Sequence, residues 1–280
     1  MVECRRCGAV YQNPRPTPER IKDFYPSAYQ PYTVTPDEEG GTRQLFRRYG
    51  LGKRIDLVRR YLSTGRLLDV GCATGDFLAE MGKAPGWKAY GIEPSFAALS
   101  YGRLHAGICA VQGLLNQPPF APAAFDVITM WDVLEHVYDP VAVVRQAALL
   151  LRPGGILVVN HPNLDSFDRQ LFGDLWVGYE LPRHLTLYPS DLLRSLMGDA
   201  GFEQIDRLCL YGSHAATNSS LMYVIEAKIK SKRLKRLSRA FLFGPVARIV
   251  LAPFFKVIDW LKLGPNLTVV FRKASQTNEG

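Results

Sequence analysis

The residues that can do chemistry first appear at a turn of small side chains between an expected strand and an expected helix. The apolar run 67–70 leads into the turn 71–75, and a helical pattern begins at Asp76. Glycines in such a turn let the backbone adopt positive φ and let a ligand approach main-chain atoms closely. Glu93 closes a second apolar run, where a carboxylate can accept hydrogen bonds from both hydroxyls of a ribose. The pattern predicts a site for a nucleoside-containing cofactor.

The spacing and charge of the turn bear on which cofactor it binds. Dinucleotide-binding loops run Gly-x-Gly-x-x-Gly and set a helix N-terminus against a pyrophosphate. Here Asp69 precedes Gly71, Ala73 and Gly75 at alternating positions, and Asp76 follows them. Anions at this mouth repel a pyrophosphate but suit a ligand that carries an ammonium and a sulfonium. An NAD site is therefore disfavoured, and a strand-turn-helix without any ligand stays an alternative.

With these residues the segment resembles the class I S-adenosylmethionine-dependent methyltransferases, in which Ala73 stands at a family glycine. The run 125–137 and the turn 152–155 also follow the family pattern, so the resemblance covers about residues 45–210 and the final strand. It implies S-adenosyl-L-methionine as the cofactor, beside the glycine turn and with its ribose on the acid of the second strand. The residues assigned to this site are Asp69, Gly71, Cys72, Ala73, Gly75, Glu93, Pro94, Gln112, Gly113, Trp131, Asp132 and Val133.

Two histidines are the candidate catalytic groups. Asp132, Glu135 and His136 resemble the acid-x-x-Glu-His segment of the quinone-biosynthesis O-methyltransferases, some of which are thought to use magnesium there. Histidine is an uncommon magnesium ligand, so we expect no metal and a helix-orienting role for this segment, with His136 as a secondary base. His184, in a long loop expected to cover the cofactor mouth, is the first candidate for a base or an acceptor-orienting group. A hydrogen bond that merely pins the loop is the alternative.

Strands and helices alternate through the middle of the chain. Helical patterns at 42–62, 94–105 and 141–151 separate apolar strands, which implies a mainly parallel sheet with helices on both faces. Ligands then bind at the carboxyl ends of the strands. Together with the resemblance, this predicts an α/β fold: a Rossmann-like seven-stranded mixed sheet whose last two strands, about 205–211 and 266–272, form an antiparallel hairpin.

Four parts follow along the chain. Residues 1–41 are a cysteine-containing appendage and lead-in, 42–211 the methyltransferase core, 212–265 a basic and apolar helical insertion, and 266–280 the final core strand and tail. Cys4-x-x-Cys7 is half of a zinc-ribbon knuckle, and a structural zinc needs four ligands. We therefore interpret the appendage as a remnant of the zinc ribbon that several members of the resembled family carry. A start-site truncation that lost the first cysteine pair is the alternative, and zinc binding by Cys4 and Cys7 is left open.

Composition limits the setting in which the protein works. The 280 residues include five cysteines, and only two of these lie close together, which suits a reducing cytoplasm over a disulfide framework. The N-terminus lacks the apolar core of a signal peptide. The net charge of +8 is concentrated at 228–239, where seven of twelve residues are Lys or Arg. No reader motif or interleaving of aromatic and basic residues favours nucleic acid.

The basic block continues into an apolar stretch that charged residues and prolines interrupt. Two short amphipathic helices in 228–263 would fit shallow attachment to an anionic membrane surface, at the inner face. A packed helical cover or a dimer contact explains the same pattern, and the oligomeric state is left open. We predict methyl transfer from S-adenosylmethionine to a small or lipid-linked acceptor, at oxygen in preference to carbon or nitrogen. The rivals are a membrane-associated binding module without turnover and an NAD-dependent oxidoreductase.

Overall fold

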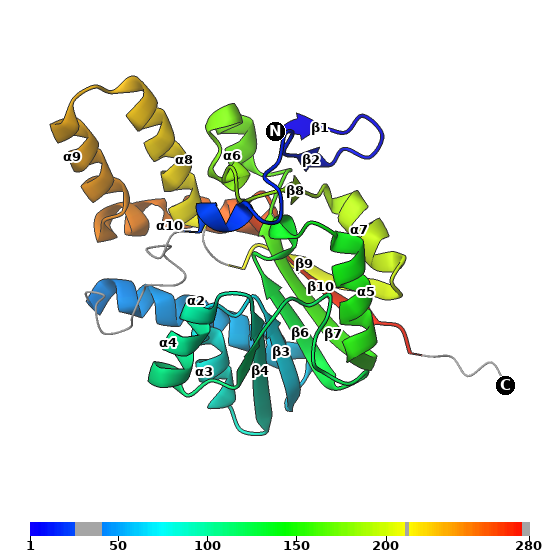
Figure 1. Ribbon diagram of the computed structural model, residues 1–280. Coiled ribbons are helices and arrows are strands. Elements are labelled where there is room, and N and C mark those ends of the chain that lie inside the picture. The colour runs from blue at the N-terminus through cyan, green and yellow to red at the C-terminus, as the bar shows by residue number, and fades with distance from the viewer. Residues whose placement is uncertain (26–40, 211–212, 276–280) are drawn as a thin grey trace.

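A seven-stranded sheet forms the centre of the protein (Figure 1). The structure is a computed structural model that describes residues 1–25, 41–210 and 213–275. Parallel strands run from the edge to β7, and β10 then pairs antiparallel with both β7 and β9. The predicted mixed sheet with a final antiparallel pair is therefore confirmed. In spatial order the strands are β5 (Ala110–Gln112), β4 (Trp87–Glu93), β3 (Gly65–Val70), β6 (Phe125–Trp131), β7 (Leu151–Pro162), β10 (Asn266–Lys273) and β9 (Phe202–Leu208).

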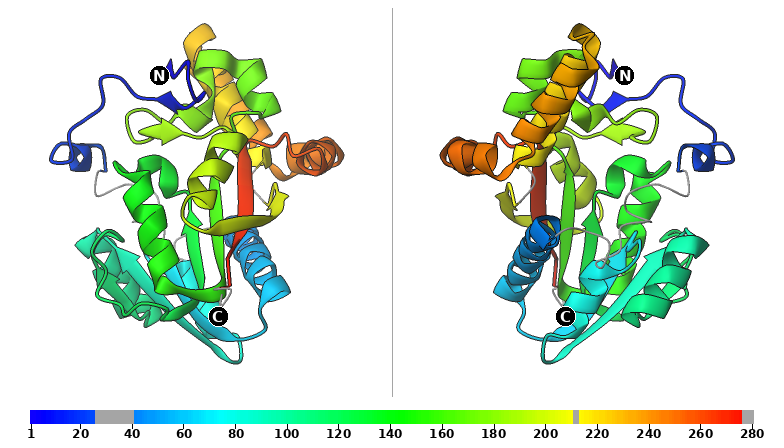
Figure 2. Two further views of the ribbon diagram at one scale, coloured as in Figure 1. Left: turned by 90° about the vertical axis from the view of Figure 1, so that its right-hand side faces the viewer. Right: turned by 90° about the vertical axis from the view of Figure 1, so that its left-hand side faces the viewer.

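Helices cover both faces of this sheet, as the alternation predicts (Figure 2). The central strands are nearly continuous apolar runs because they are buried on both sides. On one face Leu57, Leu78 and Leu99 pack against Leu67 and Val127, and on the other the helices contribute side chains to a second core. The first face carries α2 (Gly41–Tyr61), α3 (Asp76–Gly82) and α4 (Phe96–Ala106), and the second α5 (Pro140–Leu150) and α7 (Ser190–Gly198).

The fifth predicted strand is longer than expected. The sequence predicts a strand over 156–160, whereas β7 runs Leu151–Pro162. Its pairing with β6 shifts register between Phe125 and Val127, and Gly154 lies at φ 74°. A bulge of this kind lets a strand continue through a glycine turn that the sequence presents as a break.

A second layer of short elements lies at the carboxyl ends of the parallel strands, above the sheet in Figure 1. The expected long loop after β7 contains α6 (Phe167–Phe172), η3 (Gly173–Leu175), η4 (Val177–Tyr179) and β8 (Thr186–Leu187). The N-terminal hairpin, β1 (Val2–Glu3) with β2 (Val10–Tyr11), joins β8 in a small sheet through Val10 and Leu187. The appendage thus packs on the loop that holds His184. Two single-turn elements, η1 (Ile21–Phe24) and η2 (Leu134–His136), complete this layer.

The insertion between β9 and β10 contains three helices where the sequence indicates two amphipathic ones. They are α8 (Ser213–Lys228), α9 (Lys232–Leu242) and α10 (Pro245–Trp260). Among the described residues no single helix is long and apolar enough to cross a membrane, although α9 and α10 together, bent by 59°, meet that length and composition. The four-part division of the chain stays a prediction.

Candidate cofactor and acceptor site

The turn after β3 is built from three residues in the left-handed region. Gly71, Ala73 and Gly75 have φ of 68°, 48° and 78°. A Cβ at Gly75 would lie 2.4 Å from Ile108 Cδ1, and one at Gly71 would lie 2.9 Å from Val133 Cγ2. Both glycines are therefore required for backbone conformation and for close packing, as the sequence predicts. Gly75 also caps α3, and the amides of Gly71 and Gly75 donate within the protein, to Ile92 O and Cys72 O.

Glu93 links this turn by hydrogen bonds to the N-terminal end of α4. One carboxylate oxygen accepts a hydrogen bond from Ala73 N at 2.9 Å, and the other accepts one from Ser95 N at 2.9 Å. The side chain is buried at the carboxyl end of β4. Each carboxylate oxygen can accept more than one hydrogen bond, so these two bonds leave the chemistry needed for a ribose diol intact. Glu93 is thus held in place by the turn beside which the cofactor is expected.

Two further acids lie at neighbouring strand ends. Asp69 Oδ1 accepts a hydrogen bond from Thr129 on β6 at 2.6 Å, and burial raises the pKa of Asp69 to about 7. Asp132 directly follows β6, adopts φ 57° and accepts a hydrogen bond from Asn160 Nδ2 at 2.5 Å. Burial also raises the pKa of Asp132. A cationic ligand offsets the cost of burying such carboxylates, which fits a sulfonium and an ammonium.

Three side chains that the sequence analysis did not single out support these acids. Asn160 of β7 is itself held by Thr268 of β10, whose hydroxyl donates to Asn160 Oδ1 at 2.7 Å. From α2, Arg54 lies over the Trp131 ring with its Cζ 4.8 Å from the ring centroid. Its charge lowers the pKa of both Asp69 and Asp132 against the effect of burial. Asn160 could have been found from its position near the end of a predicted strand. Arg54 lies in the helix before the glycine turn, at no spacing that a sequence pattern would indicate.

The remaining predicted cofactor residues lie around the same edge. Gln112, at the end of β5, donates a hydrogen bond to Pro94 O at 3.1 Å, and Gly113 N donates to Glu93 O. Cys72 is buried, and burial raises the pKa of its thiol. It therefore packs in the turn as a small apolar residue. These contacts gather the twelve assigned residues at the ends of β3, β4, β5 and β6; their roles in binding stay predictions.

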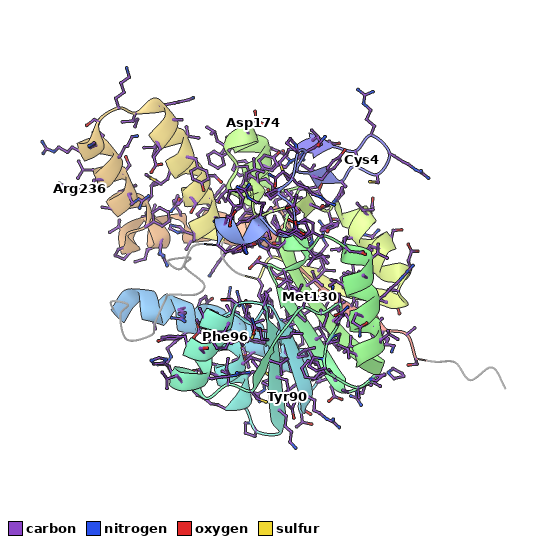
Figure 3. All side chains as sticks on the ribbon, in the orientation of Figure 1. Cys4, Tyr90, Phe96, Met130, Asp174 and Arg236 are labelled. Atoms are coloured by element: carbon purple, nitrogen blue, oxygen red, sulfur yellow. The ribbon has the colours of Figure 1, made fainter. Side chains whose placement is uncertain are left out.

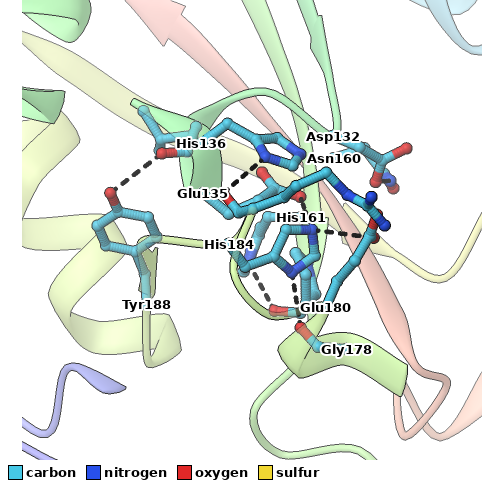
Figure 4. Close-up of polar contacts among 12 residues, drawn as sticks. Asp132, Glu135, His136, Asn160, His161, Gly178, Glu180, His184 and Tyr188 are labelled. Carbon is cyan, nitrogen blue, oxygen red and sulfur yellow. Dashed lines mark hydrogen bonds and ion pairs between the residues drawn. The ribbon is translucent and has the colours of Figure 1, made fainter. Parts of the chain in front are cut away.

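His184 lies between two carboxylates (Figure 4). Its Nδ1 donates to Gly178 O at 2.7 Å, while its Nε2 lies 3.3 Å from Glu180 Oε2 and 4.0 Å from Glu135 Oε1. Burial would lower the pKa of His184, but the hydrogen bond to Glu180 and the charges of Glu135 and Glu180 raise it overall. The bond from His184 lowers the pKa of Glu180 to about 2 against the effect of burial. Because both ring nitrogens face acceptors, His184 suits orienting an acceptor better than removing a proton.

Glu135 is the unexpected member of this cluster. Its side chain is 1% exposed, and neither carboxylate oxygen has a hydrogen-bond partner among the described residues. Burial raises the pKa of Glu135 to about 8, although the charge of His184 opposes the shift. A buried carboxylate without a hydrogen bond is costly unless a ligand or a function uses it. The sequence analysis assigned Glu135 only to orienting a local helix.

His136 adjoins the other two groups. Its ring centroid lies 4.7 Å from that of His184, and its Nδ1 lies 3.0 Å from both Arg183 O and the Tyr25 hydroxyl. Because a carbonyl oxygen only accepts, Nδ1 carries the proton and Nε2 keeps the lone pair. Burial lowers the pKa of His136 to about 4, so the ring is neutral and a weak base.

Glu135, His136 and His184 also form the one group of metal-ligating type found within the described ranges, with donor atoms within 4.8 Å of one another. A metal ligand needs a lone pair. The Nε2 of His184 instead points a proton at Glu180, and its Nδ1 donates to Gly178. With those protons in place two of the three groups keep a lone pair for a cation, and the expectation that no metal binds stays a prediction.

The geometry defines an α/β protein that gathers three acids, Asp69, Glu93 and Asp132, at the carboxyl edge of its sheet. A family model described as a methyltransferase domain matches residues 43–206, more than half of the chain. The chain belongs to this family of S-adenosylmethionine-dependent methyltransferases, and S-adenosyl-L-methionine is its cofactor. The three helices of the insertion lie outside the matched segment.

Curated relatives include two proteins named ubiquinone biosynthesis O-methyltransferase. The one from Thiobacillus denitrificans is 34% identical over 159 residues, covering 52% of this chain and 68% of its own length. The one from Ralstonia nicotianae is 35% identical over 140 residues, covering 46% of this chain and 58% of its own length. The chain thus spans between half and about two thirds of the relatives it matches.

Solved structures show the same fold. An S-adenosylmethionine-dependent methyltransferase from Thermotoga maritima superposes with a TM-score of 0.55 at 18% identity, covering 91% of this chain and 99% of that one. At this identity the likeness concerns the fold alone.

Proposed function

We propose that the protein transfers the methyl group of S-adenosylmethionine to an oxygen of a small or lipid-linked acceptor. The observation that carries the proposal is Glu135, a buried carboxylate without a described hydrogen-bond partner, three residues after Asp132 of the cofactor site. The sulfonium supplies an activated methyl group, so the protein has to align the acceptor, exclude water and take up one proton. A hydroxyl, unlike an amine, needs a base to take up its proton during the reaction.

The residues of the cluster divide this work in the proposal. Glu135 accepts the proton of the acceptor hydroxyl while the oxygen forms its bond to the methyl carbon. The bond between that carbon and sulfur breaks, its electron pair stays on sulfur, and S-adenosylhomocysteine leaves. His184 keeps its N–H groups on Glu180 and on Gly178 O, and it orients the acceptor by its fixed position beside Glu135. His136, with its lone pair on Nε2, is the second candidate for the proton. The names of the curated relatives, O-methyltransferases of ubiquinone biosynthesis, support an oxygen acceptor and a partly apolar one.

The setting of the reaction is part of the proposal. We expect the protein in the cytoplasm, with peripheral contact between residues 228–263 and the inner face of a membrane. This segment combines basic residues with exposed apolar ones on α9 and α10. Basic and exposed apolar residues together support access to a lipid-linked acceptor at a membrane surface. We propose no nucleic acid as a partner.

A labelling experiment tests the function. The protein is incubated with S-adenosylmethionine carrying a labelled methyl group and with polar or lipid fractions of a cell extract. We expect label in one acceptor, in a product whose methyl is attached to oxygen by mass spectrometry. Binding of the cofactor without transfer to any fraction would instead identify a binding module.

Removal of divalent metal is expected to leave turnover unchanged within about twofold, because the proton on His184 prevents a complete ligand set. The measurement is the initial rate of labelled methyl transfer before and after dialysis against EDTA. A rate lost on dialysis and restored by Mg²⁺ or Zn²⁺ would contradict the assignment of this cluster to proton transfer alone.

A further inference from the structure

An apolar groove lies on the insertion, apart from the cofactor edge of the sheet. It has a volume of about 560 Å³, within the range of roughly 300–1,000 Å³ common for small-molecule sites. Its walls come from α6 and η3 on one side and from α8, α9 and α10 on the other, which lie together in Figures 1 and 2. Ten of its thirteen lining residues are Phe, Leu or Val, so its chemistry suits hydrocarbon.

The polar groups of the groove are already engaged within the protein. Thr217 donates its hydroxyl hydrogen to Asp168 at 2.9 Å, and Asn218 Nδ2 donates to Leu242 O at 2.5 Å. The remaining polar lining residue is Lys228, exposed at the end of α8. The groove therefore offers an apolar interior and a cationic rim. That combination fits an aliphatic chain with an anionic or polar end.

The helices beside the groove present apolar side chains outward. On α10 Trp260 is 79% exposed, Ile249 74% and Val250 69%, and on α9 Phe241 is exposed as well. Such exposure argues against the alternative that the insertion is a packed cover, because a cover turns these side chains inward. The neighbouring basic residues point away from the core, as Arg236 does in Figure 3. An anionic bilayer complements both properties, since it attracts the basic side chains and buries the apolar ones.

A short chain of hydrogen bonds connects the groove to the acceptor pocket. Ser220 of α8 accepts a hydrogen bond from Val177 N at 3.0 Å, and the next residue, Gly178, accepts the hydrogen bond of His184 Nδ1. The segment that lines the groove through Phe167 and Leu175 thus continues directly into the turn that holds His184.

We propose that α9 and α10 dock on an anionic lipid bilayer and that the groove takes up the hydrocarbon chain of the acceptor. This rests on the proposed function, and it names the substrate class as a membrane-held amphiphile whose oxygen-bearing head reaches the Glu135 and His184 pocket.

Docking is tested with vesicles and an intrinsic probe. Trp87, Trp131 and Trp176 are buried, so Trp260 is the exposed indole among the described residues. We expect binding to phosphatidylglycerol vesicles but not to phosphatidylcholine vesicles, with quenching of tryptophan fluorescence when the lipid chains are brominated. Trp260→Phe should keep vesicle flotation and lose the quenching. Replacing Lys232 and Arg236 by Ala should weaken binding by about 30-fold, or about fivefold for each basic residue.

Chain uptake is tested with cis-parinaric acid, a fluorescent probe with a long aliphatic chain. Wild-type protein should bind it at one saturable site, and Leu221→Trp, which fills the groove, should weaken binding at least tenfold. The control is calorimetric affinity for S-adenosylmethionine, which this variant should retain if it folds. Ser219→Trp, on the exposed side of the same helix, should bind the probe as wild type does.

Either of two results would overturn the inference. One is equal binding of the probe by wild type and Leu221→Trp; the other is indifference to anionic vesicles together with a stable dimer that hides Trp260 from soluble quenchers. Neither assay uses turnover, so they separate this inference from the proposed function. Chain binding without methyl transfer would contradict only the function, and methyl transfer without chain binding only the inference.

Discussion

Glu135→Gln is expected to lower kcat by about 10²- to 10⁴-fold, the usual contribution of a positioned general base. The amide matches the carboxylate in shape but cannot accept the acceptor proton. The residue is 1% exposed, and no described residue bonds its oxygens, so the change breaks no hydrogen bond that the structure records. The measurement is the initial rate of labelled methyl transfer at saturating cofactor and acceptor.

The pH dependence separates this role from a structural one. Burial raises the pKa of Glu135 to about 8, and a base is active only after losing its proton. The kcat of the wild type should therefore rise with pH through about 8, and the residual activity of Glu135→Gln should not follow that curve. The ionised wild-type carboxyl is disfavoured in the fold. The melting temperature of the variant should therefore rise relative to that of wild type as the pH increases from about 5 to about 8, and the difference should persist above pH 8. Unchanged kcat, or a loss of melting temperature at every pH, would contradict the assignment.

Glu93→Ala is expected to weaken S-adenosylmethionine binding by about 1–3 kcal/mol, because a buried acceptor of the ribose hydroxyls is lost. The substitution also removes the bonds to Ala73 N and Ser95 N, so the turn loses part of its support. Calorimetric titration with S-adenosylhomocysteine gives the affinity, and a thermal melt shows whether the variant is folded.

The matched control is Glu80→Ala on α3. Glu80 is a partly exposed acid that pairs with Lys83 at the surface, and surface pairs of this kind contribute little. The Glu80→Ala variant should bind S-adenosylhomocysteine with the affinity of the wild type. If the Glu93→Ala variant is folded and also binds S-adenosylhomocysteine with wild-type affinity, another residue binds the ribose.

The backbone of the turn at the cofactor edge could be predicted from the sequence because backbone conformation determines residue type there. The site requires positive φ at Gly71 and Gly75 and a carboxylate at the end of β4. Each requirement is local and selects a residue type at a recognisable spacing in the sequence. The mixed seven-stranded sheet and its final antiparallel pair followed from the alternation of strands and helices together with the resemblance. Residue 73, where an alanine accepts φ 48°, shows that the local rule tolerates one methyl group.

The acceptor half was predicted less well because its contacts join distant segments. Glu180 contacts His184 from four residues earlier in the chain. The contact of the same histidine with Glu135 joins two segments that are distant in sequence, because Glu135 lies in η2 after β6. No periodicity reveals that Glu135 lacks a hydrogen-bond partner or that Asn160 is held by Thr268, 108 residues away. The insertion was identified as amphipathic, but the groove depends on how α6 packs against α8, and only the tertiary structure defines that packing.

A crystal structure of the protein with S-adenosylhomocysteine tests the central claim most directly. The account predicts the ribose hydroxyls on the Glu93 carboxylate, the adenine beside Gln112 and Gly113, and the amino-acid part at the turn of Gly71. Electron density for the nucleoside at any other place, or a cleft that stays empty at saturating ligand, would contradict it.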